Sequence, residues 1–597
     1  MKFFQLLLIT FLFAFSMIGN SAENPEPEDG KIVVGNSFSA ISDYMADGII
    51  VDFKNNVTEQ QIQRFEAKFA VDYKQYDLFP IEKIGLIKLA KGIKNLIKSL
   101  KTSPLVEAVE PNYIYSLVGE AEIVGNLRKP KDPDPADFQD PYYKHQWHMA
   151  QINLPQAFSR VQGNGAVVAV IDTGVAYEDY DRFKRVRDLN ETQFVHPFDF
   201  VDNDSHANDD HGHGTHVAGT IAQSTNNGLG VVGVAPGAAI MPLRVLDGSG
   251  RGSLGAIANA IKWAADKGAH VVNMSLGGPF PSSILRKACK YAVKKGVLLV
   301  CAAGNSGGGI GYPAKFPECM AVSAVQYDET ITFYSSRGKE VAIAAPGGNV
   351  RVDQNDDGYP DGVLQNSIYA KDNAKDDYML FMGTSMAAPH VAGAAALLVS
   401  AGITDAKRIE QILLSSAHYK GEEHLYGAGL LDVGNAVNQA IMGTGWSRLL
   451  AAFLIAFAFL KSNITRLLHP LSMLGLLAFG SGLVPFGLNC HVDQFPGFLS
   501  YPIPVWDQAL LGLDVANPIF RSAFWILLFV GFGYQIKFLR PFLQGMGFGL
   551  AGFLLVSAFM PQVDLDYIPI ALQAEFIWYI LNALLAAILA KHANPPQ

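Results

Sequence analysis

The sequence predicts an α/β fold for the middle of the chain, with a small α+β segment before it and an all-α region after it. Between residues 165 and 438, short runs that are apolar on both faces alternate with helical patterns. This alternation is typical of a mostly parallel sheet covered by helices on both sides, which makes three layers. After residue 440 charged residues become rare. The chain has 597 residues, more than one hydrophobic core accommodates, so several domains are expected.

Residues 1–22 have the pattern of a secretory signal peptide. Lys2 precedes an almost wholly apolar run, and the small residues Asn20, Ser21 and Ala22 end it. We expect cleavage after Ala22; an uncleaved anchor is the alternative. Residues 23–46 are then a linker.

Residues 47–117 predict a small α+β domain. Thr58 is a candidate helix cap, with Gln61 three residues later to complete a capping box. Strands are expected at Gly48–Phe53, Gly85–Leu89 and Val106–Leu117, and helices from Thr58 through Phe69 and over Ile93–Lys101. Residues 118–139 are rich in proline and charge, which predicts an extended, exposed linker.

Residues 140–440 carry the α/β pattern. Buried strands are expected at Ala166–Ile171, Ala239–Val245, His270–Met274, Val297–Ala302 and Cys319–Ala324. Helices are expected at Thr215–Gln223, Gly252–Lys267, Pro281–Lys295 and Ser385–Ser400. The chain has four cysteines, too few for a disulfide scaffold. Buried free thiols are expected, although the spacing also permits a disulfide.

Three motifs in this region carry residues suited to nucleophilic catalysis. Asp172 ends the run Val-Ala-Val-Ile-Asp, His213 lies in His-Gly-His-Gly-Thr-His, and Ser385 lies in Gly-Thr-Ser-Met-Ala-Ala-Pro-His. A serine hydroxyl is a poor nucleophile unless a base accepts its proton and a third group orients that base. The chain order Asp, His, Ser is one of several that build this arrangement.

These motifs and their order resemble the subtilisin-like serine proteases, the subtilase family, from about Asp140 to about Asn438. The resemblance implies a subtilisin-like three-layer domain with Ser385 as nucleophile, His213 as general base and then acid, and Asp172 orienting the imidazole. Ala302-Ala-Gly-Asn-Ser-Gly307 resembles the family's oxyanion motif, which implies that Asn305 is a side-chain donor to the oxyanion.

The same resemblance implies further roles. Residues 47–117 resemble the family's inhibitory pro-domain, which guides folding, occupies the active site and is cut in the linker. Ser275, Leu276 and Gly277 resemble the strand that pairs with the substrate backbone. Gly304 and Gly311 match glycines that line the substrate pocket and leave room for a bulky apolar side chain.

Two loops predict structural calcium. Asp353, Asn355, Asp357 and Asp361 occupy positions 1, 3, 5 and 9 of an EF-type loop, but Leu364 stands where a bidentate Glu would close it. An ordinary Asp/Asn/Gly turn is the alternative.

The second loop, Thr225–Val231, resembles the family's calcium loop. The resemblance implies ligands from the side chain of Asn227, from backbone carbonyls of the loop, and from the carboxylates of Asp140 and Asp181.

Residues 441–597 predict about five membrane helices, within a range of four to six. Apolar stretches occur near 442–460, 470–488, 522–536, 541–560 and 569–590, and several approach the ~20 residues that span a bilayer. Basic residues fall on one side (Lys461, Arg466, Lys537, Arg540, Lys591) and acidic ones on the other (Asp493, Asp507, Asp514, Asp564, Asp566), with Arg448 and Arg521, near the outer ends of their spans, as exceptions. The basic side is expected to be cytoplasmic, which puts the region before the first span outside. A hydrophobic soluble domain is the alternative.

The expected protein is therefore a serine endopeptidase of the plasma (inner) membrane, multi-pass, with its protease domain on the extracytoplasmic side, made as a self-processing zymogen. Its partners are protein or peptide substrates, the lipid bilayer and its own pro-domain. The net charge is −9 and no long basic run occurs, so nucleic acid is not expected. One alternative is a membrane signalling or assembly protein whose protease domain processes one specific partner; another is a catalytically silent fold that serves as a binding module.

Overall fold

The computed structural model describes residues 45–76, 83–88, 93–117, 138–158, 160–369, 372–482, 503–505, 522–523, 536–558 and 572–593. The predicted signal peptide, nearly all of the linkers at 23–46 and 118–139, and Cys490 lie outside these residues. Everything described belongs to one compact unit, Met45–Gln597.

The N-terminal segment folds as an antiparallel sheet with two helices. Its strands are β1 (Met45–Phe53), β2 (Tyr73–Gln75), β3 (Ile84–Lys88) and β4 (Val106–Leu117), and its helices are α2 (Glu59–Phe69) and α3 (Ile93–Leu100). The predicted capping box is present, because Thr58 Oγ1 accepts from Gln61 N and Gln61 Oε1 accepts from Thr58 N. Phe53, Phe65 and Ile87 are buried in a core of their own. The short strand β2 was not predicted.

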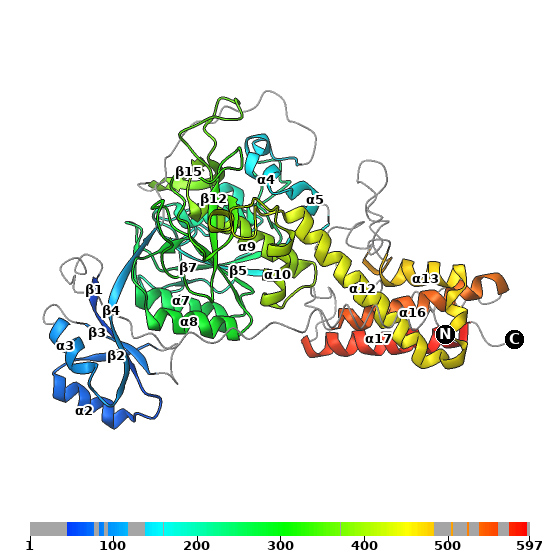
Figure 1. The fold of residues 1–597 in the computed structure, drawn as a ribbon, viewed down its shortest axis with the longest axis horizontal. Coiled ribbons are helices and arrows are strands. Elements are labelled where there is room, and N and C mark those ends of the chain that lie inside the picture. The colour runs from blue at the N-terminus through cyan, green and yellow to red at the C-terminus, as the bar shows by residue number, and fades with distance from the viewer. Residues whose placement is uncertain are drawn as a thin grey trace. The chain divides into compact units, whose positions relative to one another are not determined.

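A parallel sheet of seven strands forms the centre of the α/β region (Figure 1). Its order is β13-β12-β11-β9-β5-β7-β6, and every pair in it is parallel. The strands are β5 (Val167–Asp172), β6 (Phe198–Asp199), β7 (Ala239–Arg244), β9 (Val271–Met274), β11 (Leu298–Ala302), β12 (Met320–Val325) and β13 (Val341–Pro346). The five predicted strands are all confirmed.

The sheet is buried on both faces, as the apolar runs predicted. Along β5, Val168 and Val170 belong to one hydrophobic core, whereas Ala169 and Ile171 belong to a second. Helices α6 (His213–Ala222) and α9 (Thr384–Ser400) supply the first core, and α7 (Leu254–Asp266) and α8 (Ser283–Lys294) supply the second. The three-layer α/β architecture is confirmed.

Shorter elements complete this part of the chain. They are the helices and 3₁₀ turns η2 (Tyr143–His145), α4 (Trp147–Gln151), α5 (Leu154–Phe158), η3 (Arg187–Leu189), α10 (Ala406–Ser416) and α11 (Glu423–Tyr426), and the strands β8 (Arg251–Ser253), β10 (Leu276–Gly277), β14 (Val363–Tyr369) and β15 (Asp372–Phe381). Strands β14 and β15 form a separate antiparallel pair that was not predicted. Cys289, Cys301 and Cys319 are free thiols, and the first two are buried.

Helix α12 (Val433–Leu460) runs from the α/β region into the C-terminal region. Val433 and Val437 belong to the core beneath the sheet, whereas Ala452 and Ala456 belong to the C-terminal core. The expected domain boundary at residues 440 and 441 therefore falls inside one continuous helix.

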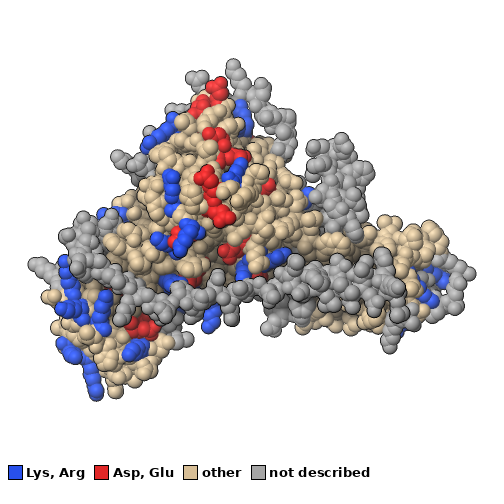
Figure 2. Space-filling model, viewed as in Figure 1, with Lys and Arg blue, Asp and Glu red and all other residues tan. Residues whose placement is uncertain are grey.

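The described C-terminal region is helical. It contains η4 (Lys461–Leu468), α13 (Pro470–Gly480), η7 (Ile503–Val505), η8 (Lys537–Leu539), α16 (Arg540–Ser557) and α17 (Leu572–Ala593). Helices α13 and α16 lie in close backbone contact, since a Cβ added to Gly545 would meet Ser472 O at 1.7 Å. Charged side chains gather over the α/β region and are sparse over these helices (Figure 2).

Only α12, with a mean hydropathy of 1.5, is long and apolar enough among the described residues to cross a bilayer. The predicted stretch at 470–488 is helical over Pro470–Gly480 in its described part, and nearly all of 522–536 lies outside the described residues. Five membrane spans therefore remain a prediction.

Candidate active site

Asp172 and His213 are held together at the carboxyl edge of the parallel sheet. Asp172 is the last residue of β5 and is fully buried, and His213 is the first residue of α6. His213 Nδ1 lies 2.7 Å from Asp172 Oδ1, which also accepts a hydrogen bond from Thr173 N at 2.8 Å. The carboxylate therefore fixes the orientation of the imidazole. His213 Nε2 is buried and has no hydrogen-bond partner in the described part of the chain, so it is available to accept a proton.

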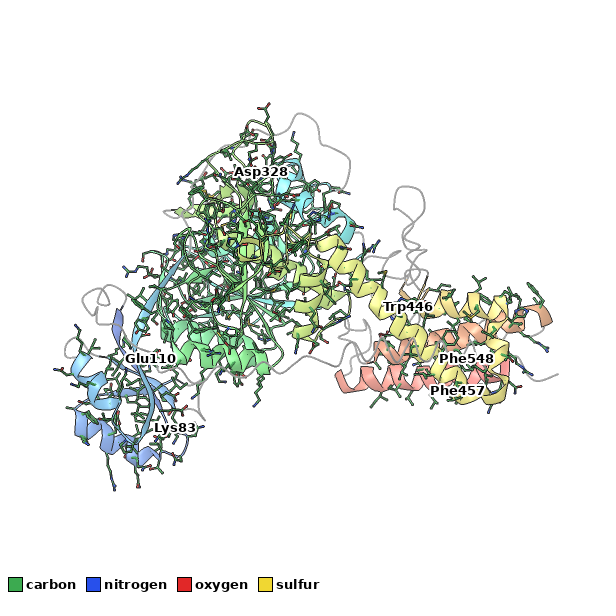
Figure 3. All side chains as sticks on the ribbon, viewed as in Figure 1. Lys83, Glu110, Asp328, Trp446, Phe457 and Phe548 are labelled. Atoms are coloured by element: carbon green, nitrogen blue, oxygen red, sulfur yellow. The ribbon has the colours of Figure 1, made fainter. Side chains whose placement is uncertain are left out.

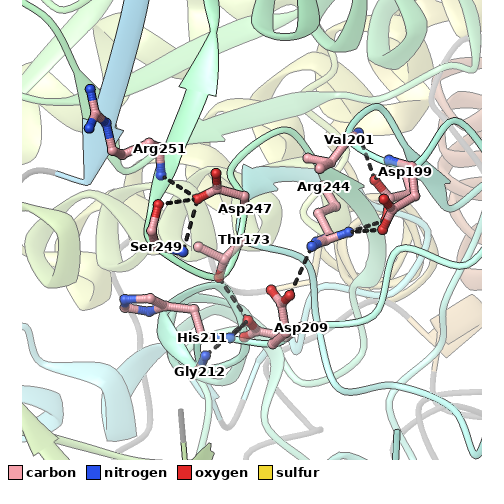
Figure 4. A network of polar contacts seen from close by, with 12 residues as sticks. Thr173, Asp199, Val201, Asp209, His211, Gly212, Arg244, Asp247, Ser249 and Arg251 are labelled. Atoms are coloured by element: carbon pink, nitrogen blue, oxygen red, sulfur yellow. Dashed lines mark hydrogen bonds and ion pairs between the residues drawn. The ribbon is translucent and has the colours of Figure 1, made fainter. Parts of the chain in front are cut away.

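A second buried carboxylate, Asp209, builds the turn that presents His213 (Figure 4). Its Oδ1 accepts from Thr173 Oγ1, His211 N and Gly212 N, each at 2.9 Å. Its Oδ2 accepts from Thr215 N at 2.9 Å and from Thr215 Oγ1 at 2.6 Å. The backbone donors among these lie at the start of α6, where N–H groups have no partner within the helix. Asp209 was not predicted, although it lies only four positions before His213.

Gly214 lets the start of α6 lie close to the end of β5. A Cβ at Gly214 would lie 2.1 Å from Gly174 O and 3.1 Å from the Cβ of Asp172. Any side chain here would therefore push α6 away from the end of β5.

Ser385 lies in the first turn of the buried helix α9, beside the end of β9. Its Oγ donates to Ser275 O at 3.1 Å, and Ser275 Oγ donates to Ser385 O at 2.8 Å. These two bonds link the serine to the Ser275–Gly277 segment that was predicted to pair with substrate. Helix α9 also directs its N-terminal dipole at the site.

Asn305 follows β11 at the same edge. Its Oδ1 accepts from Thr384 N at 3.0 Å and from Thr384 Oγ1 at 2.8 Å, and Thr384 Oγ1 accepts from Gly304 N at 3.2 Å. The carbonyl oxygen of the Asn305 amide thus accepts from Thr384, and the NH₂ group is the donor side of this amide. Thr384, directly before Ser385, was not predicted to hold this amide.

A cavity of about 790 Å³ opens beside these residues. Asn305 lines it together with the predicted Gly277, Gly304 and Gly311. Ser275 and Leu276 do not line the cavity; they lie in the adjoining segment, where β10 forms. Gly278, which also lines the cavity, was not singled out.

The strand β10 already has a partner. Leu276 pairs with Leu117 and Gly277 with Ser116, so the end of β4 lies antiparallel to β10 and at the cavity. On its other side β4 pairs with β8, and Leu117 N donates to Gly250 O at 3.0 Å. The N-terminal segment thus inserts its last strand between two strands of the α/β domain.

The predicted loop at 353–361 brings its oxygen side chains together. Asp357 N donates to Asp353 Oδ1 at 3.2 Å and to Asn355 Oδ1 at 3.1 Å. Asp361 is 1% exposed, and its Oδ1 has no hydrogen-bond partner among the described residues. Burial raises the pKa of Asp361, as do the charges of Asp353 and Asp357. A cation would relieve this repulsion.

The second predicted loop, Thr225–Val231, contacts one carboxylate that was predicted and one that was not. Asp140 Oδ2 accepts from Asn226 N at 2.7 Å, but the carboxylate that contacts Asn227 is that of Asp188, at 2.9 Å. The other predicted carboxylate, Asp181, is exposed and lies in the tight turn between Tyr180 and Phe183 with a φ of 49°.

Burial is the main cause that raises the pKa of Asp188 to about 8 and that of Asp140 to about 6. Within the described residues, no group of three or more His, Cys, Asp or Glu side chains is arranged to hold a metal ion. Any calcium here would depend on amide and backbone oxygens as well.

We predict that Asp209→Ala destabilises the protein by about 3 kcal/mol or more, because several buried donors lose a charged acceptor. The free energy of unfolding, measured by denaturant titration, tests this. Asp405→Ala is the control: Asp405 also accepts from a helix N-terminus, Arg408 N, but at an exposed position. The Asp405→Ala substitution is expected to lower the free energy of unfolding by about 1 kcal/mol. Equal costs for the two variants would contradict the role given to Asp209.

Comparison with known proteins agrees with this geometry. A model of the "Subtilase family" matches residues 163–429. The chain is 37% identical over 382 residues to a thermostable alkaline protease of Halalkalibacterium halodurans, covering 63% of this chain and 89% of that one. It is 41% identical over 265 residues to thermitase of Thermoactinomyces vulgaris, covering 44% and 85%.

Among solved structures, fervidolysin of Fervidobacterium pennivorans, a keratinolytic enzyme related to subtilisin, matches with a TM-score of 0.55 and 28% identity, over 66% of this chain and 61% of that one. The site geometry and these relatives lead to one conclusion: the chain belongs to the subtilase family and is a subtilisin-like serine endopeptidase.

Proposed function

We propose that the protein is a membrane-tethered, extracytoplasmic endopeptidase that is made as a zymogen and cuts itself between the N-terminal segment and the α/β domain. The observation that carries the proposal is the antiparallel pairing of β4 with β10 beside Ser385. A strand added to that edge is how an extended peptide substrate binds. The N-terminal segment therefore occupies the position of a substrate.

Other contacts support an inhibitory role for this segment. Tyr115 is 1% exposed and its hydroxyl donates to Phe280 O at 3.0 Å. Glu110 Oε1 accepts from Ser283 N at 2.8 Å, at the start of α8. Lys287 Nζ lies 2.8 Å from Asp52 Oδ2. These contacts hold the N-terminal segment in place while the end of β4 lies at the cavity.

The proposed reaction uses four residues. Ser385 Oγ transfers its proton to His213 Nε2 and attacks the carbonyl carbon of the scissile bond, and Asp172 stabilises the imidazolium that forms. The negative oxygen of the tetrahedral intermediate accepts hydrogen bonds from the Asn305 amide and from Ser385 N. His213 then gives the proton to the leaving amine, and water releases the acyl group by the same route in reverse.

We predict that the wild-type chain, purified in detergent, loses its N-terminal segment, whereas Ser385→Ala keeps it, since no other group replaces the nucleophile. Intact mass of both proteins measures this. Ser415→Ala, an exposed serine on α10, is the control and is expected to process normally. Spontaneous processing of purified Ser385→Ala would refute self-cleavage.

Membrane tethering is supported by the apolar surface of the C-terminal helices. Leu454 and Phe457 on α12 are 61% and 58% exposed, and Leu581 and Leu584 on α17 are 59% and 50% exposed. Figure 3 labels Phe457 on α12 and the fully buried Phe548 on α16. Side chains of this kind avoid water and suit a lipid environment.

We predict that the protein resists extraction by alkaline carbonate and that its α/β domain faces outward. In spheroplasts, a membrane-impermeant maleimide is expected to label Asp328→Cys, in an exposed loop of the α/β domain (Figure 3), without lysis. Lys591→Cys, in the last turn of α17, is expected to label only after permeabilisation. Release by carbonate, or the reverse labelling pattern, would contradict the proposal.

Structural calcium in the two loops is part of the proposal. Without calcium, Asp188 with a folded pKa of about 8 and Asp140 with one of about 6 hold protons that the unfolded chain releases near pH 4. The folded state binds more protons in that window, so these groups add stability as the pH falls from 8 towards 4.

We therefore predict that calcium raises the melting temperature more at pH 8 than at pH 5, because the ion competes with those protons. Thermal unfolding in calcium and in chelator, at both pH values, measures it. Asp188→Asn is expected to lose most of the pH dependence of the calcium effect, and the exposed Asp181→Asn to keep it. A melting temperature unchanged by chelator at pH 8 would exclude calcium.

A further inference from the structure

Arg351 is the one charged side chain among the described residues that line the cavity beside Asn305. The uncharged lining residues include Phe333, Tyr334 and Ser336. Arg351 and Phe333 are both exposed, so a substrate can reach the positive charge. A positive charge at this place biases which side chains the cavity accepts.

Arg351 is held in place by its backbone and by an aromatic ring. The backbone N–H of Arg351 donates to Asn349 Oδ1 at 3.1 Å. The loop around it is closed because Asn349 N donates to Asp361 O at 2.7 Å and Asp361 N donates to Val352 O at 2.8 Å. The guanidinium carbon lies 4.5 Å from the centre of the Phe333 ring. Stacking covers one face of the guanidinium and leaves its N–H edge for a ligand.

No carboxylate in the described part of the chain pairs with this guanidinium; the ion pairs there involve other residues. Three acidic side chains of the neighbouring loop have hydrogen-bond partners other than Arg351. Asp353 accepts from Asp357 N and Gly358 N, Asp357 Oδ2 lies 2.9 Å from His145 Nδ1, and Asp361 accepts from Gln354 N. The charge of Arg351 is therefore not neutralised within this site.

We propose that Arg351 is a specificity-determining residue that selects substrates with an Asp or Glu side chain close to the scissile bond. The proposal rests on the endopeptidase function of the site. The planar fork of a guanidinium matches a carboxylate in two parallel hydrogen bonds, which a neutral Gln or Asn side chain does not reproduce. Phe333 supplies an apolar wall for the methylene groups of the same side chain.

The chain's own sequence has the matching charge. The strand β4 ends at Leu117 in the cavity, and the next ionisable residues are Glu120 and Glu122. No basic residue follows until Arg128. Under the self-cleavage proposal this stretch is the first substrate, and it is acidic where the cavity is basic.

The experiment compares fluorogenic peptides that are identical except for Glu, Gln or Lys at one position, scanned across both sides of the scissile bond. We expect the wild type to prefer Glu to Gln by about tenfold in kcat/KM at one position, the size of one exposed charge-assisted contact. High salt is expected to shrink this preference.

Three variants test the assignment. Arg351→Gln is expected to remove the preference for Glu, so that the Glu and Gln peptides have similar kcat/KM. Arg351→Glu is expected to favour Lys at the same position. Arg182→Gln is the matched control, because Arg182 also stacks on a phenylalanine, Phe183 at 5.0 Å, but does not line the cavity.

The outcomes separate this inference from the function on which it rests. If Arg351→Gln keeps the Glu-to-Gln ratio of the wild type, or if the wild type has no such preference, Arg351 does not select substrate. If Ser385→Ala still cleaves the peptides, the assignment of the catalytic site fails instead. Loss of the preference in Arg182→Gln would show that it does not arise in the cavity.

Discussion

The parallel register of the central strands is the constraint on which the rest of the site depends. Strands β5, β9 and β11 run in the same direction as neighbours, with Ile171 beside Met274 and Met274 beside Cys301. Their carboxyl ends therefore meet at one edge of the sheet. Asp172 ends the first strand, Ser275 follows the second and Asn305 follows the third. Helices α6 and α9 begin at the same edge and add His213 and Ser385.

Close packing holds these groups in position. Helix α9 is buried along nearly its whole length, which its small side chains make possible: a Cβ on Gly393 would meet Val234 at 2.7 Å. At the start of α6, Asp209 replaces the missing intrahelical acceptors and ties the turn to Thr173, next to Asp172. The supporting residues outnumber the reacting ones, and their burial explains the fixed geometry of the site.

The strand β4 links the N-terminal segment to this edge. It is part of the segment's own sheet through β1 and of the substrate-binding edge through β8 and β10. The proposed inhibition thus uses the end of a strand whose first part belongs to the segment's own sheet. The proposed selection of acidic side chains by Arg351 concerns the next part of the same path, where the chain leaves β4.

Local sequence patterns determined much of this structure. Runs that are apolar on both faces predicted the five central strands because a sheet between two helical layers leaves no polar face. The capping box at Thr58 depends on residues three apart, so it was predictable too. The four residues proposed for catalysis were found because each lies in a small-residue motif where a strand ends or a helix begins.

Only the tertiary structure decided the rest. Asp188 rather than Asp181 contacts Asn227 because the chain after β5 makes an extra tight turn, and no local pattern gives the length of such a turn. Helix α12 crosses the expected boundary because its first turns pack under the sheet. Arg351 and Phe333 are far apart in sequence from Asn305 and Leu117. These four residues line one cavity only because four separate segments fold together. Their spacing along the chain does not reveal this.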